Sequence, residues 1–422
     1  MREAISRENL GGWLFSSFHG RDALSLSILV SIRGEDRGAG TGARLGRGKN
    51  TRPWYYVVFA DGVFSDSVCA DAVCAGGSAL KALKIVHGIE ADILEAVPGE
   101  RLEYYSREEL GAVLRDKVLP RLGGRGLACQ FSAELPVLSF LDHGTAVFLE
   151  GLGFRLVSSA ALVQRFLGLL DPGGFESHLR AARDLYAVIR TVWARLEEAM
   201  SRGEVFEGTV LSWITGELEG ASLNCSPGLI VAAGVNSGNP HYGIEGRGCP
   251  IGRQEIVQFD IWAKKKSPGA VYADISWVGF TGRRPLPRME KDFAALVRAR
   301  DGAVDFIASA LEAGKTGAAG RPPRGMDVDA HVRALLAGAG YAGALRHRTG
   351  HGIDTEVHGC GVNLDSVEFL DSRFLLEGSC FSVEPGIYFG DYGMRSEINV
   401  IIKDGRPLVS GDAPQRELLV FH

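Results

Sequence analysis

Four acidic residues and one histidine in the second half of the sequence lie among apolar residues or glycines, where a charged side chain needs a specific partner. They are Asp260, Asp274, His351, Glu384 and Glu397. Burying a lone carboxylate is costly, and a cation can offset several carboxylates at once. Four carboxylates and one imidazole form a hard donor set, rich in oxygen, that suits ions such as manganese, cobalt or zinc. The residue types therefore predict a site for two divalent metal ions.

Taken one at a time, these residues also have ordinary interpretations. An acid in a strand is usually a turn cap or an exposed edge residue, and a histidine beside glycines is usually structural. The glycines at 350 and 352, however, would let the backbone near His351 approach a ligand closely. The five residues together, in this order and with these neighbours, favour the metal site.

The two aspartates lie in successive strand-like runs. Asp260 falls in residues 255–263 and Asp274 in residues 270–280, with the turn-like Lys264-Lys265-Lys266-Ser267-Pro268-Gly269 between them. An antiparallel hairpin would set the two aspartates side by side. Like charges that close together favour a cation between them.

The elements that must position these residues begin after Asp171-Pro172-Gly173-Gly174, which breaks the chain. A long amphipathic helix is expected to open this half, because apolar residues recur at helical spacing from Leu179 to Met200. Further helices are predicted at 206–219, 293–311 and 328–336, and further strands at 229–233, 381–389 and 394–402. Two helices followed by strands, twice over, suggest an internal duplication of about 120 residues.

The first half has a different pattern and predicts a separate α/β domain. A strand is expected at 54–60, a helix at 108–119 and another strand at 126–131. Because 422 residues exceed one ordinary core, we expect two domains, residues 1–168 and 169–422. Residues 34–50 are rich in glycine and arginine and predict a surface loop. Their run 38–43 nominally fits a dinucleotide fingerprint, but no helix pattern follows it.

The composition narrows the class of protein. Apolar residues make up 45% and charged residues 23%, a normal globular mixture, and the net charge of −5 gives no general attraction to nucleic acid or anionic membranes. No apolar run approaches the roughly 18 residues of a membrane span, and the N-terminal residues lack a signal-peptide core. Seven scattered cysteines predict reduced thiols. A cytoplasmic location is therefore expected.

Residues 175–420 resemble the creatinase/aminopeptidase P/methionine aminopeptidase family, whose catalytic domain is called the pita-bread fold. The most specific match is Gly350-His351-Gly352-Ile353-Asp354-Thr355-Glu356-Val357-His358, and it is followed in order by Glu384-Pro385-Gly386-Ile387-Tyr388 and Arg395-Ser396-Glu397. Asn239-Pro240-His241-Tyr242 resembles the aminopeptidase P and prolidase branch. Residues 1–165 loosely resemble the family's creatinase-like N-terminal domain, best at 152–163. The resemblance implies an α+β protein in which this α/β domain precedes a pita-bread catalytic domain with internal pseudo-twofold duplication.

The resemblance also implies a role for each site residue. Asp260 and His351 would each be a terminal ligand of one metal ion, and Asp274 and Glu397 would bridge the two. Glu384 would be a ligand and a partner of the water that bridges the metals, and it would take the proton that this water loses on becoming hydroxide. The residues expected to act on the substrate or support the site are His241, His358 and Arg395. The implied enzyme is a homodimeric Xaa-Pro aminopeptidase, with manganese as the expected metal and cobalt or zinc as alternatives, acting on peptides with proline at the second position.

Three departures from the family pattern bear on substrate preference. The aspartates are fourteen positions apart, more than is usual, so the hairpin carries an inserted turn. Gly359 replaces a common glutamate, and Ser276-Trp277 replaces a common Thr-Arg pair. The nearest alternative is an Xaa-Pro dipeptidase (prolidase). A creatinase-like hydrolase or a binding module is less favoured, because relatives of those kinds lack several ligands that this sequence retains.

Overall fold

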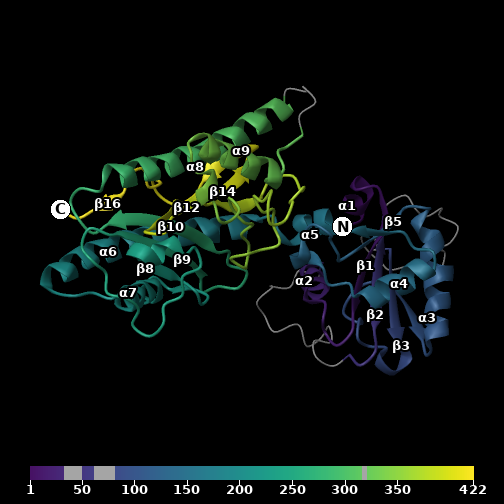
Figure 1. Ribbon diagram of the computed structural model, residues 1–422. Coiled ribbons are helices and arrows are strands. Elements are labelled where there is room, and N and C mark those ends of the chain that lie inside the picture. The colour runs from purple at the N-terminus through teal and green to yellow at the C-terminus, as the bar shows by residue number, and fades with distance from the viewer. Residues whose placement is uncertain (33–49, 61–80, 316–320) are drawn as a thin grey trace. The chain divides into compact units, whose positions relative to one another are not determined.

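The computed structural model describes residues 1–32, 50–60, 81–315 and 321–422 (Figure 1). The chain divides into two compact units, Met1–Phe166 and Leu167–His422. The glycine-rich segment predicted as a loop, with its fingerprint-like run, lies outside the described residues except for Asn50. Among the described helices, none combines the length and apolarity needed to cross a membrane.

The first unit is built on a six-stranded mixed sheet in the order β4-β3-β2-β1-β5-β6. The central pair β1 and β2 is antiparallel, whereas β5 runs parallel to β1. Every residue of β2 is buried, as its run of aromatic and branched side chains predicts. The strands are β1 (Leu10–Ser17), β2 (Trp54–Phe59), β3 (Ala82–His87), β4 (Glu100–Tyr104), β5 (Gly126–Cys129) and β6 (Leu156–Ser158). The helices are α1 (Arg2–Arg7), α2 (Ala23–Ile32), α3 (Arg107–Val113), α4 (His143–Gly151) and α5 (Ala160–Leu167).

The helix predicted at 108–119 is regular only in its first part. Ser106 caps α3 by accepting a hydrogen bond from the Glu109 N–H at 3.1 Å. The chain continues as a π-helical turn over Leu114–Val118 and a 3-10 turn over Leu119–Leu122. Pro120 lies in that last turn and has no N–H to continue an α-helical ladder.

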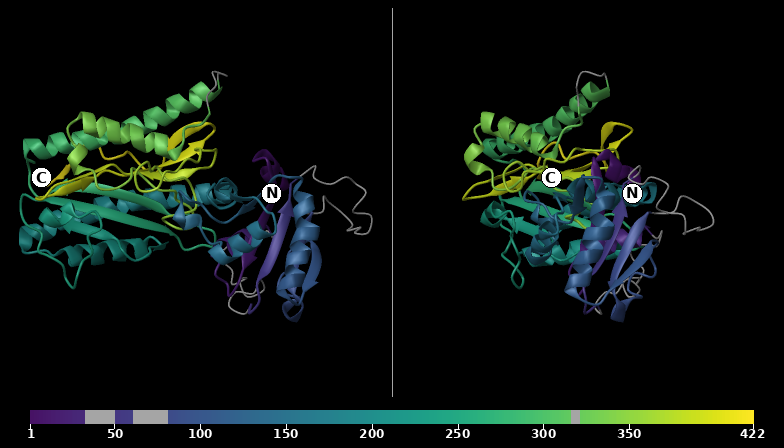
Figure 2. Two further views of the ribbon diagram at one scale, coloured as in Figure 1. Left: turned by 45° about the vertical axis from the view of Figure 1, so that its right-hand side comes forward. Right: turned by 90° about the vertical axis from the view of Figure 1, so that its right-hand side faces the viewer.

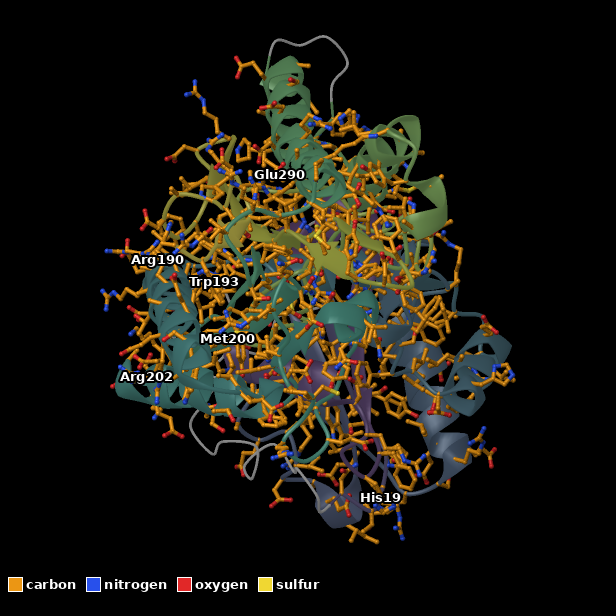
Figure 3. All side chains as sticks on the ribbon, turned by 60° about the vertical axis from the view of Figure 1, so that its left-hand side comes forward. His19, Arg190, Trp193, Met200, Arg202 and Glu290 are labelled. Carbon is orange, nitrogen blue, oxygen red and sulfur yellow. The ribbon has the colours of Figure 1, made fainter. Side chains whose placement is uncertain are left out.

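The second unit opens with α6 (Pro172–Arg202), the long amphipathic helix that the sequence predicts. Asp171 caps it by accepting a hydrogen bond from the Gly174 N–H at 2.7 Å. Trp193 and Met200 are buried on one face of α6, and Arg190 and Arg202 are exposed on another (Figure 3). The remaining helices are α7 (Glu207–Gly220), α8 (Pro287–Lys315) and α9 (Gly325–Gly338).

Three sheets lie between the two helix pairs of this unit (Figures 1 and 2). The hydrophobic core has two main clusters, one between α6, α7 and β8–β10, the other between α8, α9 and β11–β14. Each helix pair therefore covers the strands that follow it, in the repeated order that the sequence predicts. The strands are β7 (Leu223–Asn224), β8 (Ile230–Ala233), β9 (Ile256–Lys265), β10 (Ala273–Phe280), β11 (Cys380–Val383), β12 (Gly386–Tyr388), β13 (Gly393–Arg395), β14 (Ile398–Lys403), β15 (Arg406–Val409) and β16 (Leu419–Val420).

The two continuous strands predicted at 381–389 and 394–402 are each broken. The breaks fall at Glu384-Pro385 and at Ser396-Glu397, where β11 pairs with β14 and β12 pairs with β13 on either side. Proline cannot donate to a sheet ladder, so the ladder stops there. The Glu384 N–H instead donates to the Thr349 carbonyl at 2.7 Å, and the Glu397 N–H donates to the Ser276 carbonyl at 3.2 Å. At both breaks the glutamate backbone therefore bonds to a segment other than its paired strand.

Candidate metal centre

The hairpin of β9 and β10 carries the two aspartates on one face. Asp260 pairs with Ser276 and Asp274 pairs with Trp262 in the antiparallel register. Because side chains alternate between faces along a strand, Asp260 and Asp274 point the same way. They are diagonal neighbours and do not lie directly opposite each other, which corrects the expected side-by-side placement.

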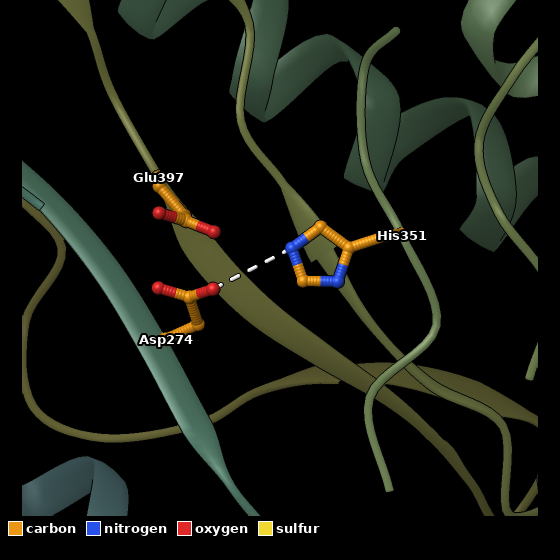
Figure 4. A group of neighbouring side chains, drawn as sticks. All are labelled: Asp274, His351 and Glu397. Atoms are coloured by element: carbon orange, nitrogen blue, oxygen red, sulfur yellow. Dashed lines mark ion pairs between the residues drawn. The ribbon is translucent and has the colours of Figure 1, made fainter. Parts of the chain in front are cut away.

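Three residues from distant parts of the second unit meet beside this hairpin. Asp274, Glu397 and His351 each offer a ligand atom, and these atoms all lie within 4.8 Å of one another (Figure 4). His351 Nε2 lies 3.4 Å from Asp274 Oδ2 and 3.5 Å from Glu384 Oε1. The loop carrying His351 is fixed by the Ser382 hydroxyl, which accepts its backbone N–H at 2.9 Å. The long-range fold thus gathers one imidazole and three carboxylates.

Two carboxylate oxygens in this group have no hydrogen-bond partner among the described residues. They are Asp274 Oδ1 and Glu397 Oε1, and both are buried. A buried charged oxygen without a partner costs free energy, whereas coordination to a cation would satisfy it. The donor set present here fits a divalent metal ion.

Burial and neighbouring charges shift the pKa values of three carboxyl groups in the site. Burial raises the pKa of Asp274 well above its usual value, and repulsion from Asp260 and Glu384 adds to the rise. Burial likewise raises the pKa of Glu397, with further repulsion from Asp274. For Glu384, burial acts upward, but its interactions with His351 and Arg395 leave its pKa below the usual value. A bound dication would favour the ionised form of all of them.

Asp260 has its own set of partners. It forms an ion pair with Arg395, and its Oδ1 accepts the Ser276 hydroxyl at 2.6 Å. The Ser276 hydroxyl also lies 3.0 Å from Glu397 Oε2 and accepts a hydrogen bond from Arg395 Nε at 3.0 Å. Sequence reasoning missed this linking role of Ser276. Its position two residues after Asp274, on the same strand face, is the signal that could have indicated it.

A cavity of about 450 Å³ opens onto this group. The predicted substrate residues His241 and His358 line it, together with Asp260, Asp274, His351, Glu384 and Arg395. The ring centroids of His358 and His351 are 4.3 Å apart. Burial, followed by the fields of His351 and Arg348, lowers the pKa of His358 to about 4. Glu397 is not among the residues lining the cavity but lies next to Asp274. All eight predicted site residues therefore belong to one group.

Two further residues, not predicted as site residues, lie beside this group. His347 also lines the cavity, and its Nε2 lies 2.8 Å from the Tyr388 hydroxyl. Arg395 Nη1 in turn lies 3.4 Å from that hydroxyl. Because His347 and Tyr388 are 41 positions apart, only the fold brings them together.

Comparison with known proteins gives a consistent set of relatives. The sequence profile of Metallopeptidase family M24 matches residues 176–404. "Probable dipeptidase PepE" of Mycobacterium tuberculosis is 28% identical over 300 residues, 71% of this chain and 72% of that protein. "Xaa-Pro dipeptidase" of Lactobacillus delbrueckii subsp. lactis is 32% identical over 212 residues, 49% of this chain and 51% of that protein.

A solved structure agrees with the sequence comparison. The crystal structure of dipeptidase PepE from Mycobacterium ulcerans aligns over 100% of this chain and 95% of its own, with a TM-score of 0.63 and 22% identity. This likeness concerns the fold and confirms the predicted fold class. The profile covers more than half of the chain and includes every predicted metal ligand. The chain therefore belongs to Metallopeptidase family M24, as the resemblance predicted.

Proposed function

We propose that Asp260, Asp274, His351, Glu384 and Glu397 hold two divalent metal ions, with manganese as the first candidate and cobalt or zinc as alternatives. The observation that carries this proposal is the pair of buried, unpartnered oxygens, Asp274 Oδ1 and Glu397 Oε1, close to His351. Burial lowers the pKa of His351, which keeps its imidazole in the neutral form that binds metals.

The proposed reaction is hydrolysis of the bond between an N-terminal residue and a following proline. When bound, two such ions supply an activated water and polarise the substrate carbonyl. Glu384 faces the cavity with a lowered pKa, so it is ionised and can accept a proton and later pass it to the leaving nitrogen. The nitrogen of proline carries no hydrogen before cleavage, so its departure depends on that proton.

The other site residues hold the substrate and the ligands in this proposal. His358 donates a hydrogen bond to the oxygen that becomes negative, and His241 orients the scissile bond. Arg395 holds Asp260 in place through their ion pair. Ser276 links Asp260 and Glu397 through its hydroxyl.

Cleavage of dipeptides alone is the second candidate. The relatives favour it, since the mycobacterial protein is named a dipeptidase and the Lactobacillus protein an Xaa-Pro dipeptidase. Either activity uses the same metal centre and the same bond, so the two candidates differ in how much peptide follows the proline.

One experiment tests both the metal site and the choice between the two peptidase activities. The purified chain is analysed for metal and assayed with matched Xaa-Pro dipeptides, Xaa-Pro-Xaa tripeptides and Xaa-Ala controls. We expect about two ions per chain and cleavage only before proline. Asp274→Asn should lose metal and turnover, and Asp305→Asn, an exposed acid on α8, is the matched control.

The outcomes are distinct. Cleavage of tripeptides supports the aminopeptidase, and cleavage of dipeptides alone supports the dipeptidase. Full activity of Asp274→Asn in chelator-treated buffer would contradict the two-metal site. Neither metal nor cleavage in the parental chain would leave a creatinase-like hydrolase or a binding module as the remaining candidates.

A further inference from the structure

Glu207 is fully buried and is the first residue of α7. Both of its carboxylate oxygens accept hydrogen bonds from one segment of the chain. Its Oε1 accepts the Ala233 N–H at 2.9 Å and the Asn236 amide at 3.0 Å. Its Oε2 accepts the Tyr242 hydroxyl at 2.8 Å and the Cys249 N–H at 2.9 Å. Four donors from different parts of residues 233–249 therefore converge on one side chain.

We name residues 234–249 the His241 segment. Its end is also tied to α7 by backbone bonds, because the Glu207 N–H donates to the Cys249 carbonyl at 3.1 Å and the Gly208 N–H to the Arg247 carbonyl at 3.0 Å. The fit there is close, since a Cβ on Gly208 would lie 2.8 Å from that carbonyl oxygen. Glu207 thus joins the start, the middle and the end of the segment.

The middle of the His241 segment reaches the metal centre. Pro240, His241 and Tyr242 line the same cavity as Asp260 and His351, whereas Glu207 does not line it. His241 is exposed, and its imidazole has no hydrogen-bond partner among the described residues. Its position therefore depends on the backbone, which the adjacent Tyr242 ties to Glu207.

We propose that Glu207 is a positioning residue for His241, which it holds at the cavity by clamping the segment at Ala233, Tyr242 and Cys249. This inference rests on the proposed function, because there His241 contacts the substrate. The clamp requires a carboxylate, since only that group accepts from four donors on two oxygens. In Glu207→Gln, an amide N–H₂ would replace an oxygen that accepts two hydrogen bonds, and the backbone N–H of Ala233 or Cys249, which cannot accept in return, would lose its partner.

The test is a double-mutant cycle on the metal-loaded full chain with an Xaa-Pro dipeptide. It compares the parental chain, Glu207→Gln, His241→Ala and the double variant, with Glu245→Gln, an exposed acid of the same segment, as control. Small misplacements of an active-site group can cost about 10²-fold, so we expect Glu207→Gln to lower kcat/KM by about tenfold or more. Metal content should not change.

The decisive result is whether the effects of Glu207→Gln and His241→Ala on kcat/KM are coupled. In the His241→Ala background, Glu207→Gln should cause no further loss, because the group that it positions is already absent. Equal losses in both backgrounds, or parental kinetics of Glu207→Gln, would overturn the proposal. Tyr242→Phe removes the hydroxyl's bonds to Glu207 and Asn236 but keeps the carboxylate and its other three donors, so it provides a milder variant with a smaller loss that should also vanish in His241→Ala.

Hydrogen–deuterium exchange separates this proposal from the proposed function. In Glu207→Gln, exchange should quicken within the His241 segment and stay parental in β9 and β10. If the parental chain cleaves no peptide, the proposed function fails, and the exchange result alone decides whether Glu207 holds the segment. Unchanged exchange in residues 234–249 would overturn the clamp.

Discussion

Replacement of His358 by alanine should separate substrate chemistry from metal binding. His358 lines the cavity and its ring packs against His351, but in the proposed site it is not a ligand. Its loss should therefore leave about two metal ions per chain while turnover falls. The measurements are metal content by elemental analysis and kcat and KM on an Xaa-Pro substrate.

The magnitude follows from the protonation state of His358. Because its pKa is lowered to about 4, His358 is neutral at pH 7 and acts as a neutral donor. A dication at His351 would lower that pKa further. Loss of one donor to a developing oxyanion typically costs about 10² to 10³ in kcat. We expect a loss in that range, a smaller change in KM, and no titration of His358 in the rate profile between about pH 5 and 8.

Two variants control this experiment. His358→Gln keeps an N–H donor and should recover part of the lost turnover, and His143→Ala, at an exposed site on α4, should behave as the parental chain. The reasoning is refuted if His358→Ala loses its metal, or if it turns over substrate at the parental rate.

Three further predictions concern stability and assembly. In chelated protein, Asp274 and Glu397 have raised pKa values, so at pH values below their ordinary pKa values of 3.8 and 4.5 they stabilise the folded state relative to the unfolded chain. This stabilisation is lost as the pH rises. The gap in Tm between metal-loaded and chelated protein should therefore widen from about pH 4.5 to neutrality, and a constant gap would contradict this. Ser276→Ala leaves Asp260 Oδ1 without its donor and should lower the free energy of unfolding of chelated protein by about 1–3 kcal/mol in urea titrations. Ser276→Thr should restore most of that loss, and equal values for both variants would argue against the hydroxyl bond. By resemblance to the family we expect a homodimer, and a monomer mass by light scattering at micromolar concentration would refute it.

Much of the local structure can be read from the sequence because its causes are local. Apolar residues at helical spacing predicted α6, and the buried aromatic run predicted β2. The strand-like runs around Asp260 and Asp274, with a turn between them, predicted the hairpin that β9 and β10 form. Side chains alternate along a strand, so Ser276, two positions after Asp274, could have been predicted from the sequence to share its face.

The details of pairing depend on contacts across the chain and were not predicted. The register of β9 and β10 decides that Asp260 and Asp274 are diagonal neighbours. The break at Glu384 has a local contribution from Pro385, but at both breaks the glutamate N–H is satisfied by a residue far away in sequence, Thr349 or Ser276. Periodicity within either run carries no trace of those partners, so both runs were predicted as continuous strands.

The site also combines features that the sequence predicts with features that depend on long-range contacts. The sequence alone determined which residues have the chemistry to bind metal, because an acid or a histidine among apolar residues and glycines stands out by type and neighbours. Only the tertiary structure decided which oxygens are left without partners, that His347 meets Tyr388, and that Glu207 holds the segment next to His241. Such contacts join residues tens of positions apart, and their formation depends on the packing of the whole unit. No short pattern in the sequence encodes them.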